Sequence, residues 1–152
     1  MNTVDTVTIL NRLIVTSKNG EHALASAADE AWHEELKESL SEYSRFFGQA
    51  ARDLQEMVRK MGGRPRGLGT FDNTLHRTWM HIRAKAMGRR EDVILDDVEQ
   101  DEAEADFMFD DAVRNWDTPP EIHAMLERQA AEAHRHHEAI HQLRARLVGH
   151  HA

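Results

Sequence analysis

The 152-residue sequence predicts an all-α protein, an antiparallel bundle of four long helices with one long connection. Two observations support this fold class. Apolar residues recur at intervals of three and four along almost the whole chain, and no stretch alternates between apolar and polar residues as a strand does. Half of the eight glycines lie within residues 62–69, which marks one dominant loop. We therefore expect a single helical domain over residues 1–152.

The first two apolar stripes predict helices over about residues 4–29 and 33–61. The stripes are out of phase, which indicates a break between Asp29 and His33 although no glycine or proline marks it. Because the break is short, the two helices should be antiparallel neighbours. The first stripe is Val7, Leu10, Ile14, Ser17, Glu21, Leu24 and Ala28, and the second is Leu36, Leu40, Tyr43, Phe47, Ala50, Leu54, Met57 and Met61.

The other two long helices are predicted over about residues 91–116 and 119–148. Thr118 and Glu121 form a capping-box pattern, with Pro119 at the first helical position. The third stripe is Leu95, Val98, Glu102, Ala105, Phe109, Ala112 and Trp116, and the fourth is Ile122, Leu126, Gln129, Ala133, His136, Ile140, Leu143 and Leu147.

The connection between the second and third long helices decides the topology. Gly62 follows the second stripe as a helix C-cap residue should, and a shorter amphipathic helix is predicted over about residues 71–87. A connection of nearly thirty residues is long enough to cross the bundle from one end to the other, whereas short loops alone would not need it. One long crossover is the arrangement of ferritin-like bundles.

Composition excludes several function classes. The formal charge of −8 argues against a nucleic-acid binder, and the absence of cysteine excludes disulfides, zinc-thiolate sites and thiol catalysis. No apolar run approaches the roughly 20 residues of a membrane span, and the start of the chain does not resemble a secretory signal, so we expect a cytoplasmic location. No phosphate loop, nucleophile elbow or HExxH motif is present, so we expect no organic cofactor and assign no catalytic residue.

Polar residues that interrupt the apolar stripes are the candidates for function, because a buried charge needs a partner or a metal. Counted at 1.5 Å per residue, several of them fall roughly 15 Å from the same end of the bundle. This layer predicts a single iron or zinc site, since both ions accept oxygen and nitrogen ligands. Any enzyme activity would then be that of a metal-dependent oxidase. The candidate ligands are Glu21, Glu102, Glu132, and His136 or His137.

A two-metal site is not expected. Two-metal ferritin-like sites use Glu-x-x-His on two helices, but the second helix offers Glu42-x-x-Arg45 and the fourth offers Glu132-x-x-Arg135. Arginine stays protonated and cannot ligate a metal.

A metal-free alternative explains the same residues. Glu21 and Glu102 could hydrogen-bond to Tyr43, Gln129 and His136, and this polar layer would only fix the register of the helices. A carboxylate pair acting on an organic substrate is a third interpretation, but nothing in the sequence indicates a substrate pocket.

Two further features concern the outside of the bundle. Ile9 and Leu13 face away from the first stripe, so either the crossover helix or a second subunit should cover them, and we expect a homodimer. His134, His137 and His141 have the spacing that captures transition metals adventitiously, although outward histidines are usually solvated.

Several motifs together carry a family resemblance over about residues 7–145. They are Leu10-Asn-Arg-Leu-Ile with Asn19-Gly-Glu21, Leu54-Gln-x-Met-Val-Arg-Lys-Met-Gly-Gly63, Leu75-His-Arg-Thr-Trp79-Met, Ile94-Leu-x-x-x-Glu99-x-x-Glu102, Pro119-Pro-Glu, and Leu126-Glu-Arg-Gln129-x-x-Glu132 with His137. In these motifs the sequence resembles bacterial ferritin-like four-helix-bundle proteins that are classed as a domain of unknown function. The resemblance implies the ferritin-like fold and, through a looser likeness to ferritins and bacterioferritins, a role in iron handling or stress response.

Overall fold

The structure, a computed structural model, describes residues 3–67 and 91–149, which form four long helices. They are α1 (Thr3–Glu30), α2 (Glu34–Lys60), α4 (Glu91–Asn115) and α5 (Pro120–Gly149). Each begins and ends within one residue of the range expected from the apolar stripes. The described ranges contain no strand, so the all-α bundle is confirmed. The short helix predicted over 71–87 lies outside the described residues.

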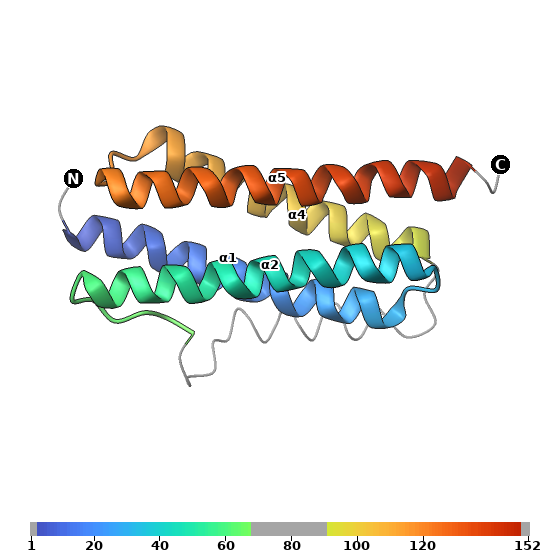
Figure 1. Ribbon diagram of the computed structural model, residues 1–152, viewed down its shortest axis with the longest axis horizontal. Helices are drawn as coiled ribbons and strands as arrows, with labels where there is room; N and C mark the ends of the chain where they lie inside the picture. The colour runs from blue at the N-terminus through green and yellow to red at the C-terminus, as the bar shows by residue number, and fades with distance from the viewer. Residues whose placement is uncertain (1–2, 68–90, 150–152) are drawn as a thin grey trace.

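Each helix packs against two neighbours, α1 and α5 both lying against α2 and α4. Figure 1 shows that α1 is antiparallel to α2 and that α4 is antiparallel to α5. Helix α2 ends where α1 begins, and α4 begins at the opposite end of the bundle. The chain therefore crosses the length of the bundle between Lys60 and Glu91, which is the single long crossover of ferritin-like topology.

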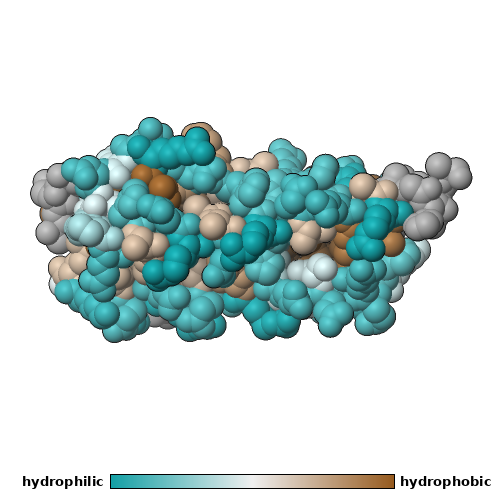
Figure 2. Space-filling model, turned by 45° about the horizontal axis from the view of Figure 1, so that its top comes forward, coloured by the Kyte–Doolittle hydropathy of each residue, from teal (hydrophilic) through white to brown (hydrophobic). Residues whose placement is uncertain are grey.

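The apolar stripes form the core, and the face of the molecule in Figure 2 is largely hydrophilic. Helices α1 and α2 approach closely at two glycines. A Cβ atom on Gly20 would lie 2.7 Å from Cδ2 of Phe47, and one on Gly48 would overlap the carboxylate of Glu21. None of the helices in the described ranges has the length and apolarity that a membrane crossing requires.

The break between α1 and α2 forms without glycine or proline because α4 holds it. The Glu91 carboxylate accepts hydrogen bonds from the backbone N–H groups of Trp32 (2.5 Å) and His33 (3.0 Å), and its other oxygen lies 2.5 Å from Nδ1 of His33. Burial by itself would raise the pKa of Glu91, but these hydrogen bonds lower it below its usual range. The first residue of α4 thus replaces the missing side-chain cap of α2.

Two helix-capping motifs were predicted from the sequence, a glycine C-cap at the end of α2 and a capping box at the start of α5, and only the first is formed. Gly62 adopts a φ of 79°, and the N–H groups of Gly62 and Gly63 bond to the carbonyls of Arg59 and Val58, so the glycine C-cap is confirmed. The capping box is wrong. Thr118 Oγ1 is buried without a hydrogen-bond partner among the described residues, because α5 starts one residue later than the capping box requires.

The two apolar residues of α1 that suggested a homodimer are already covered. Ile9 and Leu13 are 5% and 1% exposed within one chain, so no second subunit is needed to cover them. The homodimer itself stays a prediction.

Candidate functional site

The interface between α4 and α5 carries an ordered row of contacts between acidic side chains and arginine or histidine side chains. α4 contributes aspartate and glutamate side chains, and α5 contributes histidine and arginine side chains. Successive turns of the two helices therefore contact each other through one acidic and one basic residue type. In order from the start of α4, the pairs are Arg144 with Asp96 and Glu99, His141 with Glu99, His137 with Glu102 and Asp106, and His134 with Asp106. The exposed histidines are therefore paired with acids as well as solvated.

Glu102 is the most deeply buried acid of this row. It is 2% exposed, and neither of its carboxyl oxygens has a hydrogen-bond partner among the residues that the structure describes. Burial raises the pKa of Glu102 to about 9, and the negative charges of Asp106, Glu99 and Asp101 add to the rise. In the absence of a cation, the carboxyl group is therefore neutral at pH 7.

His137 lies between Glu102 and a second acid. Its Nδ1 is 2.6 Å from Oδ2 of Asp106, a short hydrogen bond, whereas its Nε2 is 3.7 Å from Oε2 of Glu102, beyond hydrogen-bonding distance. The other oxygen of Asp106 is also buried and has no partner in the described part of the chain. The imidazole thus has one nitrogen engaged and the other facing a buried carboxyl.

Tyr43 of α2 completes this buried group. Its ring stacks between Phe47 and His136, with centroids 4.8 and 5.1 Å apart, and its hydroxyl is buried without a partner from the described residues. Burial raises the pKa of Tyr43 above its ordinary value, and the charges of Glu102 and Asp106 raise it further. The phenol therefore stays protonated.

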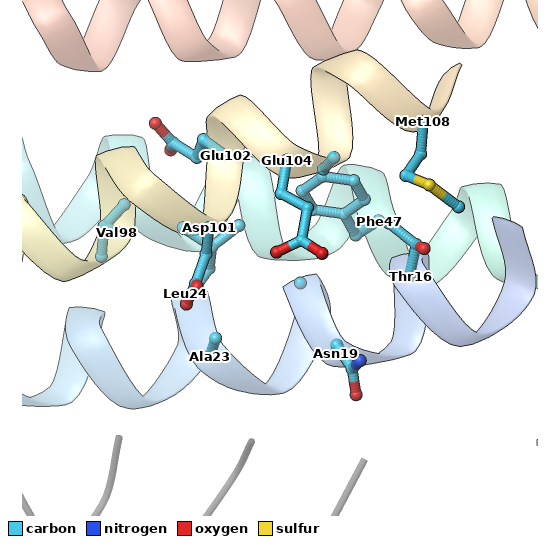
Figure 3. Close-up of a pocket in the computed structure, with 12 residues that line it drawn as sticks. Thr16, Asn19, Ala23, Leu24, Phe47, Val98, Asp101, Glu102, Glu104 and Met108 are labelled. Atoms are coloured by element: carbon cyan, nitrogen blue, oxygen red, sulfur yellow. The ribbon is translucent and has the colours of Figure 1, made fainter. Parts of the chain in front are cut away.

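A pocket of ≈ 210 Å³ between α1 and α4 lies behind Glu102. Figure 3 shows that Asp101 and Glu104 point toward α1, whereas the carboxyl group of Glu102 points away from α1. The stem of Glu102 therefore lines this pocket, while its polar end belongs to the interface of α4 with α5.

The family described as Domain of unknown function (DUF2383) matches residues 5–115. The chain belongs to the DUF2383 family. No curated protein matches it significantly. The DUF2383 match spans α1, α2 and α4 and so includes Tyr43, Glu102 and Asp106, whereas His137 lies on α5, beyond the matched residues.

Of the five predicted ligands in this DUF2383 chain, Glu102 and His137 are brought together. Glu21 lies at the expected height but against α2, where Gly48 leaves room for its carboxylate and Lys18 lies 3.8 Å away. No described contact joins Glu21 to Glu102 or His137.

The remaining two predicted ligands lie on a different side of α5. Glu132 is exposed, and His136 is half-buried against the rings of Tyr43 and Phe46. Burial lowers the pKa of His136, although the charges of Glu132 and Glu42 oppose that effect. Within residues 3–67 and 91–149, no three His, Asp or Glu side chains are arranged so that they could hold a metal ion together.

The hydrogen bonds of the metal-free alternative are not formed in this DUF2383 chain. The hydroxyl of Tyr43, both carboxyl oxygens of Glu102 and both amide atoms of Gln129 are buried without partners among the described residues. Gln129 lies eight residues before His137 on α5, roughly 12 Å along the helix, and so in a different layer.

Asp106 was not among the predicted ligands, because it lies beside the apolar stripe of α4 and not on it. Asp106 flanks the α4 stripe, one turn after Glu102. The signal was present in the spacing: Glu102 and Asp106 are four residues apart on α4, and the α5 histidines at 134, 137 and 141 repeat with the same helical period.

Proposed function

We propose that this protein binds one transition-metal ion, iron or zinc, at the interface of α4 and α5, with Glu102 and His137 as its protein ligands. The observation that supports this proposal is the buried carboxyl of Glu102, which has no hydrogen-bond partner among the described residues and faces Nε2 of His137. A buried polar group without a partner costs about 1–3 kcal/mol, so a bound ion or ordered water should satisfy this carboxyl group, and the proposal is that an ion does so.

The residues fit such an ion in chemistry and spacing. Carboxylate oxygen and imidazole nitrogen are ligands for both iron and zinc. Two ligands that each bind one ion at about 2.1 Å lie between 3 and 4 Å apart at ordinary coordination angles, by rough geometry. The 3.7 Å between Nε2 of His137 and Oε2 of Glu102 falls in this range.

Two protein ligands are one fewer than the three of a typical catalytic zinc site, so water or substrate would have to fill the remaining coordination positions. Iron in this place would supply redox chemistry, which suits the iron-handling or stress-response role that the family resemblance implies. The chain's own contribution is a buried site. Tyr43 and Phe47 shield it on the side of α2, and the protonated phenol hydroxyl can donate a hydrogen bond within the site.

Elemental analysis tests the proposal. Tag-free protein purified without chelator, then titrated with ferrous iron and with zinc, should hold about one ion per chain, and Glu102→Gln should lose it. Glu21→Gln and Glu132→Gln are matched controls that also remove one negative charge each, and they should retain the ion. Equal binding by Glu102→Gln and the wild type would overturn the proposal, as would binding that disappears only when His134 and His141 are replaced.

A metal-free interaction bundle is the second candidate, and the observation that favours it is the absence of a three-ligand group among the described residues. On this alternative, ordered water fills the space around Glu102. No tightly bound metal in the wild type and in both titrations would favour it, and the search would then turn to protein partners.

A further inference from the structure

The hydrogen bond between His137 and Asp106 determines which nitrogen of the imidazole carries a proton. A carboxylate only accepts hydrogen bonds, so in the 2.6 Å contact Nδ1 of His137 must be the donor. In the neutral ring the proton is then on Nδ1, and the lone pair is on Nε2. Nε2 is the atom that faces Glu102 at 3.7 Å.

We infer that Asp106 is a positioning residue: it holds His137 in the tautomer and orientation that direct the lone pair of Nε2 at Glu102. The consequence for metal affinity rests on the proposed function. A carboxylate that holds the second nitrogen of a ligating histidine raises the basicity of the ring and fixes its orientation. Asp106 would therefore act through His137 without touching the ion.

The surroundings of Asp106 suit this role better than a simple helix-to-helix tie. Its side chain is 17% exposed, so the hydrogen bond is shielded from competing water. Its other neighbour on α5, His134, is 74% exposed and its Nδ1 lies 3.9 Å away, so His134 is a weak competitor for the same oxygen. Asp106 follows Glu102 by one helical turn, so both carboxyl groups reach the same imidazole.

The test is a nitrogen-15 NMR measurement on chelator-treated protein labelled at histidine, at pH 8, with the His137 signals assigned from a His137→Gln variant. We expect a proton on Nδ1 and a bare Nε2 in the wild type, and a shift toward the tautomer protonated at Nε2 in Asp106→Ala. Asp106→Asn keeps an acceptor oxygen at almost the same place and should restore part of the wild-type signature. Glu104→Gln, which removes an acidic charge from the opposite side of α4, should change nothing.

The same variants are then titrated with zinc. Asp106→Ala should bind about 10- to 100-fold more weakly than the wild type, and Asp106→Asn should fall between them. A wild-type His137 that carries a proton on both nitrogens or on Nε2 alone would overturn the inference, as would an unchanged tautomer in both Asp106 variants. Because the tautomer is read without metal, a wild type with the expected tautomer but no zinc binding would contradict the proposed function and leave the positioning by Asp106 supported.

Discussion

Oε2 of Glu102 on α4 and Nε2 of His137 on α5 face each other across 3.7 Å, too far for a hydrogen bond and with no other described partner for that carboxyl. On the proposed function, a cation bound at this place would compete with the proton on Glu102. Without a cation, burial and the neighbouring acids keep the carboxyl protonated. A bound cation would reverse that balance, because an opposite charge at contact distance favours the ionised form.

The raised pKa of Glu102 predicts that the metal-free protein loses stability as the pH rises. The folded pKa of about 9 lies above the unfolded value, so this contribution is complete below about pH 4 and declines as the pH approaches 9. By pH 7 the loss is roughly 3 kcal/mol. Glu102→Gln is neutral at every pH and should lack this decline, so urea unfolding in chelator should show the variant more stable than the wild type at pH 8.

Other groups also titrate over this range, so the quantity to compare is the difference in unfolding free energy between the two proteins. That difference should grow from pH 5 to pH 8. A constant difference would show that Glu102 is ionised in the folded protein. Glu132→Gln, at an exposed position on α5, should give a difference near zero throughout.

The lowered pKa of Glu91 predicts the opposite pH dependence at the end of the bundle. A folded pKa below the unfolded value gives stability that is present at neutral pH and is lost as the pH falls through the folded pKa. Glu91→Gln should cost about 2 kcal/mol at pH 7, because two backbone N–H groups lose a charged acceptor. The gap between variant and wild type should close in acid, as followed by thermal unfolding from pH 7 to pH 3.

The two close-approach glycines predict different responses to the same substitution. Alanine gains about 1 kcal/mol of helix propensity at either position. In Gly20→Ala the new methyl group meets the ring of buried Phe47, and the overpacking cost offsets or exceeds the gain, so a net loss of up to about 2 kcal/mol is expected. In Gly48→Ala it meets only the end of the half-exposed Glu21 side chain, so the net change should be near zero or stabilising.

Gly48→Ala also tests the site by a second route. It displaces the carboxylate of Glu21 without changing any charge. Zinc binding should be unaffected if Glu21 is not a ligand, and calorimetric titration of folded Gly48→Ala compares it directly with the wild type. A large loss of zinc affinity in Gly48→Ala would show that Glu21 is a metal ligand after all.

The sequence predicted heights along the helices better than directions around them. The 1.5 Å rise per residue is nearly constant, so Glu21, Tyr43 and Glu102 were placed in one layer by counting alone. The direction in which a side chain points around its helix depends on where the neighbouring helix leaves space for it. Glu21 turns toward α2 because Gly48 has no side chain there, and such a gap is not visible in the apolar stripe of α1.

The α4–α5 pairing was hidden for a related reason. Asp106 and His137 lie beside their stripes, and a flanking position can be solvated or paired depending on the rotation of the helix opposite. The apolar stripe shows which face of a helix points to the core, but it does not fix the rotation about the helix axis closely enough to tell which flanking residue contacts the next helix. The helix bounds were predictable because they depend on local signals; the partners of flanking residues depend on packing between segments that are 31 residues apart in sequence.

Arg144 supports a last prediction, on how the helix pair is held together. Its guanidinium binds Asp96 and Glu99 of α4, and it is only 20% exposed. Asp96 is 66% exposed, whereas Glu99 is 23% exposed, so water and salt screen the first pair more than the second. Double-mutant cycles by urea unfolding should therefore give a larger coupling energy for Arg144 with Glu99, about 1–2 kcal/mol, than for Arg144 with Asp96.

The exposed pair of Arg146 and Glu35 is the reference and should couple by less than about 0.5 kcal/mol. Equal coupling of Arg144 to both acids would mean that burial does not set the strength of this row.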